Sequence, residues 1–189
     1  AGNGLVAIAS SPTTRIFYSA INDGTTWTPA SDYFDVEDTT NEPVTGLKEY
    51  SNFLMIFKWN SMHRYNLASL TQVNNQVGAW NHFCPQEINK LLYTFSPAGI
   101  FVTNGESTQN IGEPVKEYWK NFQPIFETSG TSRIVTNCSA GRYKYFYLLF
   151  IGDITLDDAS TLSDVVLVYN TITKSWTLYD GFTDLINFI

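Results

Sequence analysis

The sequence predicts an all-β protein, formed as a β-propeller or part of one, from four-stranded antiparallel blades with one short inserted helix. Three observations favour this fold. Aromatic and β-branched segments typical of strands recur along all 189 residues, Gly/Asn/Asp turns separate them, and a Trp often closes the unit. Repetition on this scale indicates a repeat architecture, which usually serves as a scaffold or a binding surface. Copies of the unit lie at 15–27, 53–65, 91–102 and 165–179.

The spacing of comparable aromatic residues gives the size of the unit. Phe17 and Phe57 are 40 residues apart (57 − 17), Phe57 and Tyr93 are 36 apart (93 − 57), and Tyr93 and Phe146 are 53 apart (146 − 93). Propeller blades have roughly 40 to 50 residues and four strands, so about four blades fit within residues 1–189. Because the chain lacks an initial Met and stops within an apolar stretch at 185–189, we expect a segment of a longer chain or a processed product.

Composition narrows the class of protein further. Hydrophobic residues make up 43% and aromatic residues 15%, which is too apolar for a disordered chain, while charged residues make up only 15%. The net charge is −7 and there is no run of Lys or Arg, so neither tight nucleic-acid binding nor a basic membrane-surface patch is expected. The longest apolar run, 145–151, is too short to span a bilayer.

The strands are expected in order along the chain, each bounded by turn residues. Asn22-Asp-Gly24 has the composition of a hairpin turn that needs positive φ at Gly24, with Trp27 packing into a blade core. The acidic, Ser/Thr-rich segment 153–163 is expected to be a hairpin loop, and the Asn/Gln-rich segment 72–78 a loop. The expected strands are 5–9, 15–21, 33–36, 46–50, 54–59, 62–67, 80–84, 91–95, 100–103, 133–138, 143–151, 165–169, 175–179 and a terminal segment at 185–189.

One helix is expected, at 113–122. Pro114 stands at a helix-start position. Val115, Tyr118, Trp119 and Phe122 follow at i, i+3, i+4 and i+7, which gives one apolar face. This face either packs on the protein's own sheet or docks on a neighbouring subunit.

Two hairpins resemble those of known propeller families. The segment Ala20-Ile-Asn-Asp-Gly-Thr-Thr-Trp27 resembles the Asp-box of sialidase-type propellers, Ser-x-Asp-x-Gly-x-Thr-Trp, with Ala20 in place of the Ser and Asn22 in place of the Asp. In that family the box is a structural hairpin outside the active site. The segment Val168-Tyr-Asn-Thr-Ile-Thr-Lys-Ser-Trp176 resembles a kelch-type blade hairpin without the double glycine of kelch repeats.

A succession of motifs over most of the chain is similar to propeller-like structural proteins of tailed-phage virions. The resemblance implies a structural component of the tail or neck, in a nozzle-like assembly, and no enzyme. The implied partners are copies of the chain and other virion proteins, and the implied location is the virion, assembled in the host cytoplasm. The motifs in order are Arg15-Ile-Phe-Tyr-Ser19 with Thr26-Trp27, the acidic strand 33–36, Val44-Thr-Gly-Leu47, Leu54-Met-Ile-Phe-Lys58, Gly99-Ile-Phe101, Ile111-Gly-Glu-Pro-Val115 and the final aromatic strand with its Val-Tyr…Trp-Thr hairpin.

No catalytic, metal-binding or cofactor-binding residue is predicted. His63 and His82 have no nucleophile paired with them, and Arg64 and Arg142 belong to separate repeats, although arginines at matching blade positions could converge on a propeller axis. Cys84 and Cys138 lack the spacing of metal ligands and are expected to be buried thiols, with a disulfide as the alternative. The carboxylates Asp35, Glu37, Glu49 and Glu87 are scattered along the sequence, whereas a glycosidase needs two opposed carboxylates, and Arg15 and Arg133 lie in separate repeats. The acidic residues Asp153, Asp157, Asp158 and Asp164 lack the EF-hand spacing that would indicate a Ca²⁺ site.

Two other functions remain open from the sequence. A sialidase-like or carbohydrate-binding propeller would use Trp and Tyr side chains to stack on sugars, and a kelch-like module would bind other proteins. The acidity is compatible with passage of DNA through a ring without specific binding, because a negative lumen repels phosphates. No membrane partner is expected.

Overall fold

A computed structural model describes residues 7–9, 14–20, 22–37, 42–129 and 132–181. The fold is all-β: strands make up 51% of the described residues, which contain one short α-helix. No helix in this described part is long and apolar enough to cross a membrane. The expected strand at 185–189 lies outside the described residues.

The strands form five antiparallel sheets, and within each sheet the neighbours in sequence are the neighbours in space. The first sheet has three strands, β1 (Ala7–Ala9), β2 (Arg15–Tyr18) and β3 (Tyr33–Asp35). The second has four, β4 (Gly46–Tyr50), β5 (Phe53–Phe57), β6 (Met62–Tyr65) and β7 (Leu70–Asn74). The third has β8 (Gln86–Ile88), β9 (Leu91–Ser96), β10 (Gly99–Thr103) and β11 (Thr108–Asn110). A separate hairpin, β12 (Phe126–Ser129) and β13 (Ser132–Val135), precedes the fourth sheet, β14 (Ser139–Tyr143), β15 (Phe146–Thr155), β16 (Thr161–Asn170) and β17 (Ser175–Tyr179).

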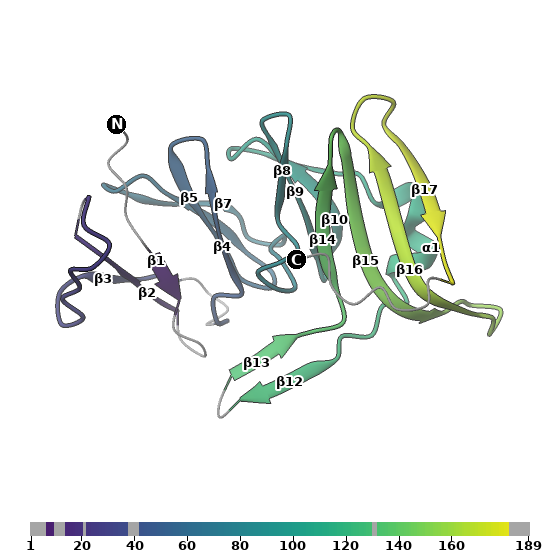
Figure 1. Ribbon diagram of the computed structural model, residues 1–189, viewed down its shortest axis with the longest axis horizontal. Coiled ribbons are helices and arrows are strands. Elements are labelled where there is room, and N and C mark those ends of the chain that lie inside the picture. The colour runs from purple at the N-terminus through teal and green to yellow at the C-terminus, as the bar shows by residue number, and fades with distance from the viewer. Residues whose placement is uncertain (1–6, 10–13, 21, 38–41, 130–131, 182–189) are drawn as a thin grey trace.

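The four larger sheets follow one another in a row, in the order in which they occur in the sequence (Figure 1). Neighbouring sheets meet through their first strands at two places: β1 is in contact with β4, and β8 with β14 as well as β15. The β12–β13 hairpin projects to one side of the row (Figure 1). The chain therefore repeats one unit, an antiparallel meander, and places each new unit beside the previous one.

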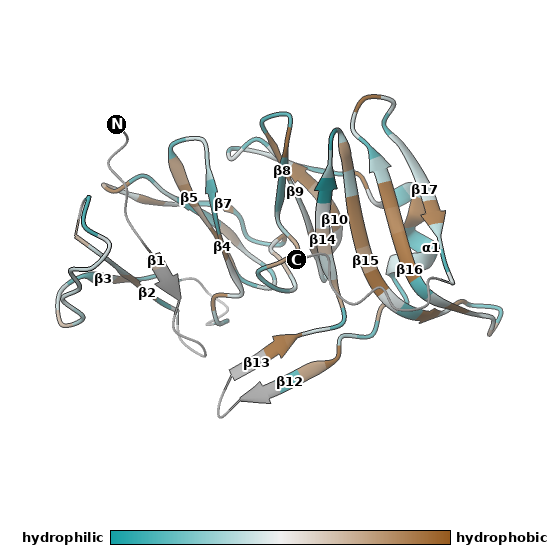
Figure 2. Cartoon of the chain, in the orientation of Figure 1, coloured by the Kyte–Doolittle hydropathy of each residue, from teal (hydrophilic) through white to brown (hydrophobic). Residues whose placement is uncertain are grey.

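One apolar core runs through the second, third and fourth sheets. It includes Phe57 of β5, Phe95 of β9 and Leu149 of β15, all at most 1% exposed. In the fourth sheet Leu149 pairs with Leu167, and Tyr147 with Tyr169 and then Trp176, so residues two apart share the inward face. The strands that supply this core, β5, β15 and β16 among them, carry the most apolar segments of the chain (Figure 2).

The first sheet packs against the opposite face of the second sheet through a smaller cluster. Ile16, Val36, Val44 and Ile56 form its buried centre. Ile56 lies between Met55 and Phe57 in β5, and those two belong to the larger core, so alternate residues of one strand serve the two neighbours. The second sheet is thus covered on both faces, as the interior member of a row must be.

Close backbone contacts between the second and third sheets require a small residue at position 78. A Cβ on Gly78 would lie 1.9 Å from the carbonyl oxygen of Lys58. The next residue, Ala79, donates its N–H to that same oxygen at 2.8 Å. The connection leading to the third sheet is therefore held directly against the β5–β6 turn.

The helix is shorter than the sequence indicated. A 3-10 turn spans Glu113–Val115 and α1 spans only Lys116–Trp119. The chain turns after α1, where Phe122 donates its N–H to the Trp119 carbonyl and inserts into the main core at 7% exposure. Of the two expectations for the apolar face, packing on the protein's own sheets is the one observed: Val115 and Phe122 join the core, and Tyr118 and Trp119 pack against it.

Four further expectations about strands were wrong. The strand β7 (Leu70–Asn74) includes the first three residues of the segment 72–78, which was expected to be a loop. Residues 80–84, expected as a strand, form turns that Asn81 stabilises with its side chain. The strands β15 and β16 extend into the segment expected to be a loop at 153–163, and leave only 156–160 as the tip. The turn Asn22-Asp-Gly24 does not form a tight hairpin between β2 and β3: these strands pair with each other, but β2 ends at Tyr18 and β3 begins at Tyr33, so the turn lies within a longer connection.

Candidate functional site

The turn that resembles an Asp-box is built around Asp23. Its carboxylate accepts hydrogen bonds from the Thr25 N–H (3.0 Å), the Thr25 hydroxyl (2.6 Å) and the Thr26 hydroxyl (2.6 Å). These bonds, that of the Thr25 hydroxyl first, lower the pKa of Asp23 from 3.8 to about 2. Asp23, one position after the Asn22 that stands at the Asp of the box, therefore fixes the turn.

Two expectations for this turn are corrected. Positive φ falls on Asn22 (61°) and not on Gly24. Trp27 is half-buried, lies outside both apolar clusters, and donates its indole N–H to the Gly24 carbonyl at 2.8 Å. Asn tolerates the left-handed region, and the carboxylate of Asp23 supplies the local bonds that hold it there. The turn is structural in its geometry, but its Trp closes the turn itself and not a blade core.

The two histidines lie in different settings. His63 is buried in β6, with its Nε2 3.2 Å from the Ser61 hydroxyl. His82 lies at the surface with its ring partly covered, and it accepts the Leu47 N–H at Nδ1 (3.4 Å). The partial burial of the ring, and then Lys48, lower the pKa of His82. His82 thus links the turn before the third sheet to β4.

The arginines bind acceptors within the protein. Arg15 makes a two-pronged ion pair with Asp35, with both distances 2.9 Å, and stacks its guanidinium over Tyr33. Arg64 of β6 donates to the Gly105 carbonyl of the third sheet at 3.3 Å, and Arg142 of β14 donates to the Glu87 carbonyl of the same sheet at 3.1 Å. Arg64 and Arg142 therefore connect neighbouring sheets. The side chain of Arg133 lies outside the described residues.

The remaining carboxylates are dispersed. Glu37 and Glu49 are exposed and Glu87 is half-buried, and they lie after β3, in β4 and in β8. At the β15–β16 tip Asp157 pairs with Lys120 and Asn121, and Asp158 accepts the Ser160 N–H and hydroxyl. These bonds lower the pKa of both Asp157 and Asp158. In the described part of the chain, no three His, Cys, Asp or Glu side chains gather as a metal site would require.

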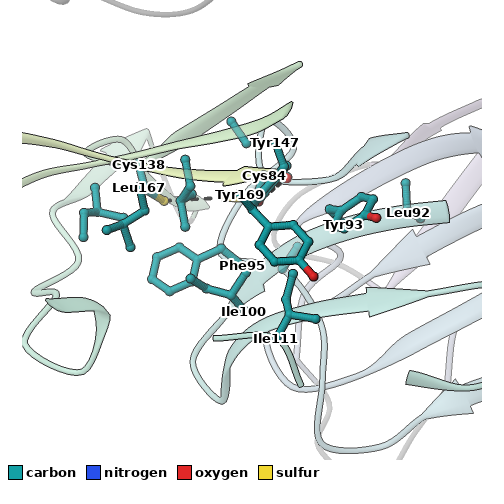
Figure 3. Packing of buried hydrophobic residues seen from close by; sticks show 14 of the residues in the cluster. Cys84, Leu92, Tyr93, Phe95, Ile100, Ile111, Cys138, Tyr147, Leu167 and Tyr169 are labelled. Atoms are coloured by element: carbon teal, nitrogen blue, oxygen red, sulfur yellow. Dashed lines mark hydrogen bonds between the residues drawn. The ribbon is translucent and has the colours of Figure 1, made fainter. Parts of the chain in front are cut away.

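The most unusual buried group is a cluster of thiols and phenols between the third and fourth sheets (Figure 3). The Sγ atoms of Cys84 and Cys138 are 3.6 Å apart, so the cysteines are thiols and not a disulfide. The Tyr147 hydroxyl donates to the Cys84 carbonyl at 3.1 Å, and Tyr93 stacks on Tyr147 with ring centroids 5.6 Å apart.

The chemistry of this cluster is that of a packed core. The hydrogen bond from Cys84, followed by burial, raises the pKa of the Cys138 thiol well above 9. Burial raises the pKa of Tyr147, and it raises that of Tyr93 to about 12. Because the thiolate is the reactive form of cysteine, Cys138 stays protonated and unreactive at neutral pH.

Asn81 organises the polar contacts around the cluster. Its side-chain amide is 3% exposed and donates to the carbonyls of Val135 (2.7 Å) and Cys138 (2.8 Å). Its oxygen accepts the N–H groups of Phe83 (2.9 Å) and Cys84 (3.2 Å). One side chain thus joins the entrance to the third sheet to the entrance to the fourth. Sequence reasoning missed this role, since these partners lie up to 57 residues away.

In comparisons with known proteins, no family model and no curated protein matches this chain.

The clearest surface feature is a set of three turns joined by hydrogen bonds, which we call the lysine turns: 89–91, 143–145 and 171–174. The Asn89 side chain donates to the Thr171 hydroxyl at 3.1 Å, and the Thr171 N–H donates to the Tyr145 carbonyl at 3.0 Å. Each turn carries one exposed lysine and one exposed apolar side chain. These are Lys90, Lys144 and Lys174, with Leu91 (37% exposed), Tyr143 (59%) and Ile172 (65%).

Proposed function

We propose that the chain forms a β-propeller, or part of one, and serves as a structural component of the tail or neck of a tailed bacteriophage. The observation that carries the proposal is the repeated placement of antiparallel meanders side by side, with first strands in contact between the first and second sheets and between the third and fourth, and with a core shared by three sheets. Propeller blades pack in this way around an axis, with the first strand of each blade innermost.

Exposed apolar side chains support a role in assembly. Lone exposed apolar residues are ordinary, but here several stand on turns and on the projecting hairpin, where they are accessible to a partner protein. A low charge content and many aromatic residues are also typical of surfaces that bind other proteins. The large apolar side chains most exposed are Leu67, Phe83, Leu91, Ile125, Ile134, Tyr143, Ile172 and Tyr179.

The charge of the chain supports passage of DNA without specific binding. With a net charge of −7, a ring of such subunits repels phosphates and lets a duplex slide. The proposed partners are therefore copies of the chain and other virion proteins, in particles assembled in the host cytoplasm.

Size-exclusion chromatography with light scattering and negative-stain microscopy tests this proposal. We expect a ring-shaped oligomer, or incorporation of the chain into a ring with other virion proteins, and no retention of duplex DNA at physiological salt. A strictly monomeric protein with no affinity for any virion component contradicts the assembly function.

A glycoside panel tests the sialidase-like alternative. Because Arg64 and Arg142 already bind backbone carbonyls of the third sheet, we expect no turnover. Turnover of a sialoside that is lost in Arg64→Ala or Arg142→Ala would favour the enzyme instead.

A further inference from the structure

The lysine turns and the opposite end of the same sheet have complementary surfaces. The turns at 89–91, 143–145 and 171–174 contain three exposed lysines and no Asp or Glu. Arg142, next to Tyr143, adds a further exposed cation. Three apolar side chains between 37% and 65% exposed stand among these charges. An apolar surface with a basic rim fits an acidic protein surface that has apolar groups of its own.

Such an acidic surface lies at the other end of β15 and β16. Asp153, Asp157 and Asp158 are exposed around the tip between these strands, and within the described residues only Asp157 of the three is paired with a cation, Lys120, so the tip keeps a net negative charge. The base of the β12–β13 hairpin lies close by: a Cβ on Gly152 would be 3.4 Å from the carbonyl oxygen of Asn137, and the Asn137 side chain accepts the Ile125 N–H at 2.7 Å.

The β12–β13 hairpin lies at the same end of the molecule as this tip and carries exposed apolar side chains (Figure 1). Phe126 pairs with Val135, which is buried in the core, and the ring of Phe126 contacts that of Trp59. Glu127 and Ile134, the next pair along the hairpin, face the other way, as does Ile125. Ile125 and Ile134 are 60% and 51% exposed on that outward face, with the exposed Glu127 beside them.

The two surfaces are too far apart to neutralise each other within one molecule. β15 has ten residues, which at about 3.3 Å per residue gives roughly 30 Å between the lysine turns and the tip. Charges on the protein surface are screened beyond about 8 Å at physiological salt. Figure 1 shows the β14–β15 and β16–β17 turns at the top of the fourth sheet, and the β15–β16 tip and the hairpin at the bottom.

We propose that the lysine turns of one copy of the chain dock on the acidic tip and the β12–β13 hairpin of a second copy. The contact joins two different surfaces, so it is head-to-tail and leads to a closed ring or an open stack. The charges set the orientation and speed the encounter, and the exposed apolar side chains supply the buried area. This inference rests on the proposed assembly function and names the surfaces that such an assembly uses.

Charge reversal followed by sedimentation velocity tests the contact. In the wild-type chain we expect self-association that increases with protein concentration and falls as sodium chloride is raised. The double variant Lys144→Glu/Lys174→Glu should be monomeric, because like charges then meet. Asp157→Lys/Asp158→Lys should be monomeric for the same reason. The control, Lys116→Glu, changes an exposed lysine of α1 outside the lysine turns and should associate as the wild type does.

Mixing the two double variants gives the decisive result. Each keeps one surface that fits an intact surface of the other, so the mixture should recover association that neither variant shows alone. Circular dichroism of each variant, matching that of the wild type, shows that the fold is retained. Recovery cannot arise from misfolding of either variant.

The proposal is overturned if both variants associate as the wild type does, or if the mixture stays monomeric. If rings form with Lys144→Glu/Lys174→Glu unchanged, this contact is wrong but the assembly function stands. If the wild-type chain is monomeric yet binds another virion protein, the proposed contact is again wrong and the assembly function again stands. A monomeric chain that binds no virion component contradicts both.

Discussion

Replacing Asn81 with Ala should cost the fold more than the removal of any other single polar side chain around the cysteine cluster. The amide of Asn81 bridges the turn before the third sheet and the connection to the fourth through four bonds to backbone groups. Ala can adopt the same backbone conformation as Asn81, but its side chain makes none of these four hydrogen bonds. The substitution therefore removes the link between sheets and leaves the apolar packing nearly unchanged.

The magnitude follows from the partners that are left behind. A buried polar group without a partner costs about 1–3 kcal/mol. The carbonyls of Val135 and Cys138 lose their amide donor in a buried site, while the Cys84 N–H keeps a long bond of 3.4 Å to the Asn81 carbonyl. The Phe83 N–H is only partly buried and can bond to water. We therefore expect a loss of about 3–4 kcal/mol in the free energy of unfolding, below the simple sum.

Urea denaturation followed by Trp fluorescence measures this loss. Asn66→Ala is the matched control: its oxygen also accepts two backbone N–H groups, from Ala68 (3.1 Å) and Ser69 (2.8 Å), but in an exposed turn. There we expect about 1 kcal/mol or less, because water replaces the lost bonds. If Asn81→Ala costs no more than Asn66→Ala, the reasoning that this side chain joins the two sheets is refuted.

Three further predictions follow from other contacts. Gly78→Ala should prevent native folding, because the new Cβ would lie 1.9 Å from the carbonyl oxygen of Lys58. The control Gly181→Ala has no atom within 4 Å of the new Cβ and only a φ of +72°, so it should reduce the free energy of unfolding by about 1 kcal/mol. Equal solubility and equal melting temperatures of the two variants would contradict this prediction. Cys84 and Cys138 should react with Ellman's reagent only after unfolding, because both are buried and the pKa of Cys138 is raised; rapid reaction of the native protein would be the opposite outcome. The NMR signal of the Trp27 indole N–H should titrate with a midpoint near pH 2, because the pKa of Asp23 is lowered from 3.8 to about 2. The hydrogen bonds to the Asp23 carboxylate are complete above pH 3.8 and are lost as the pH falls through the lowered pKa. A midpoint near pH 4 would show that the turn does not stabilise the ionised carboxylate.

The strands were the most predictable part of the structure, because their signal is local. β17 has the expected bounds, Ser175–Tyr179, since Trp176 and Leu178 alternate with polar or exposed residues. β12 was missed because Phe126–Ser129 has one apolar residue and depends on its pairing with β13. The helix ended early because Phe122 belongs to the core of the sheets, which turns the chain after Trp119.

Contacts between repeats could not be predicted from one sequence. Cys84 and Cys138 meet across 54 residues, and nothing in their spacing indicates it. The lysine turns have a visible local signal, a lysine in each of three short turns, but only the packing of the third sheet on the fourth brings Asn89 to Thr171. The Asp-box-like turn differs, because its motif is visible in the sequence. The side chain that accepts the hydrogen bonds of the turn is Asp23, one position after the Asn22 that the motif indicates.

If the chain is a propeller or part of one, its meanders are blades arranged around an axis. Cryo-electron microscopy of the purified assembly tests it most directly, because the position of each sheet relative to the axis is then seen. We expect β4, β8 and β14 to line the axis, and each sheet to pack its face on the next with the lysine turns at one end. Sheets stacked in layers, with these three strands apart from one another, would contradict it.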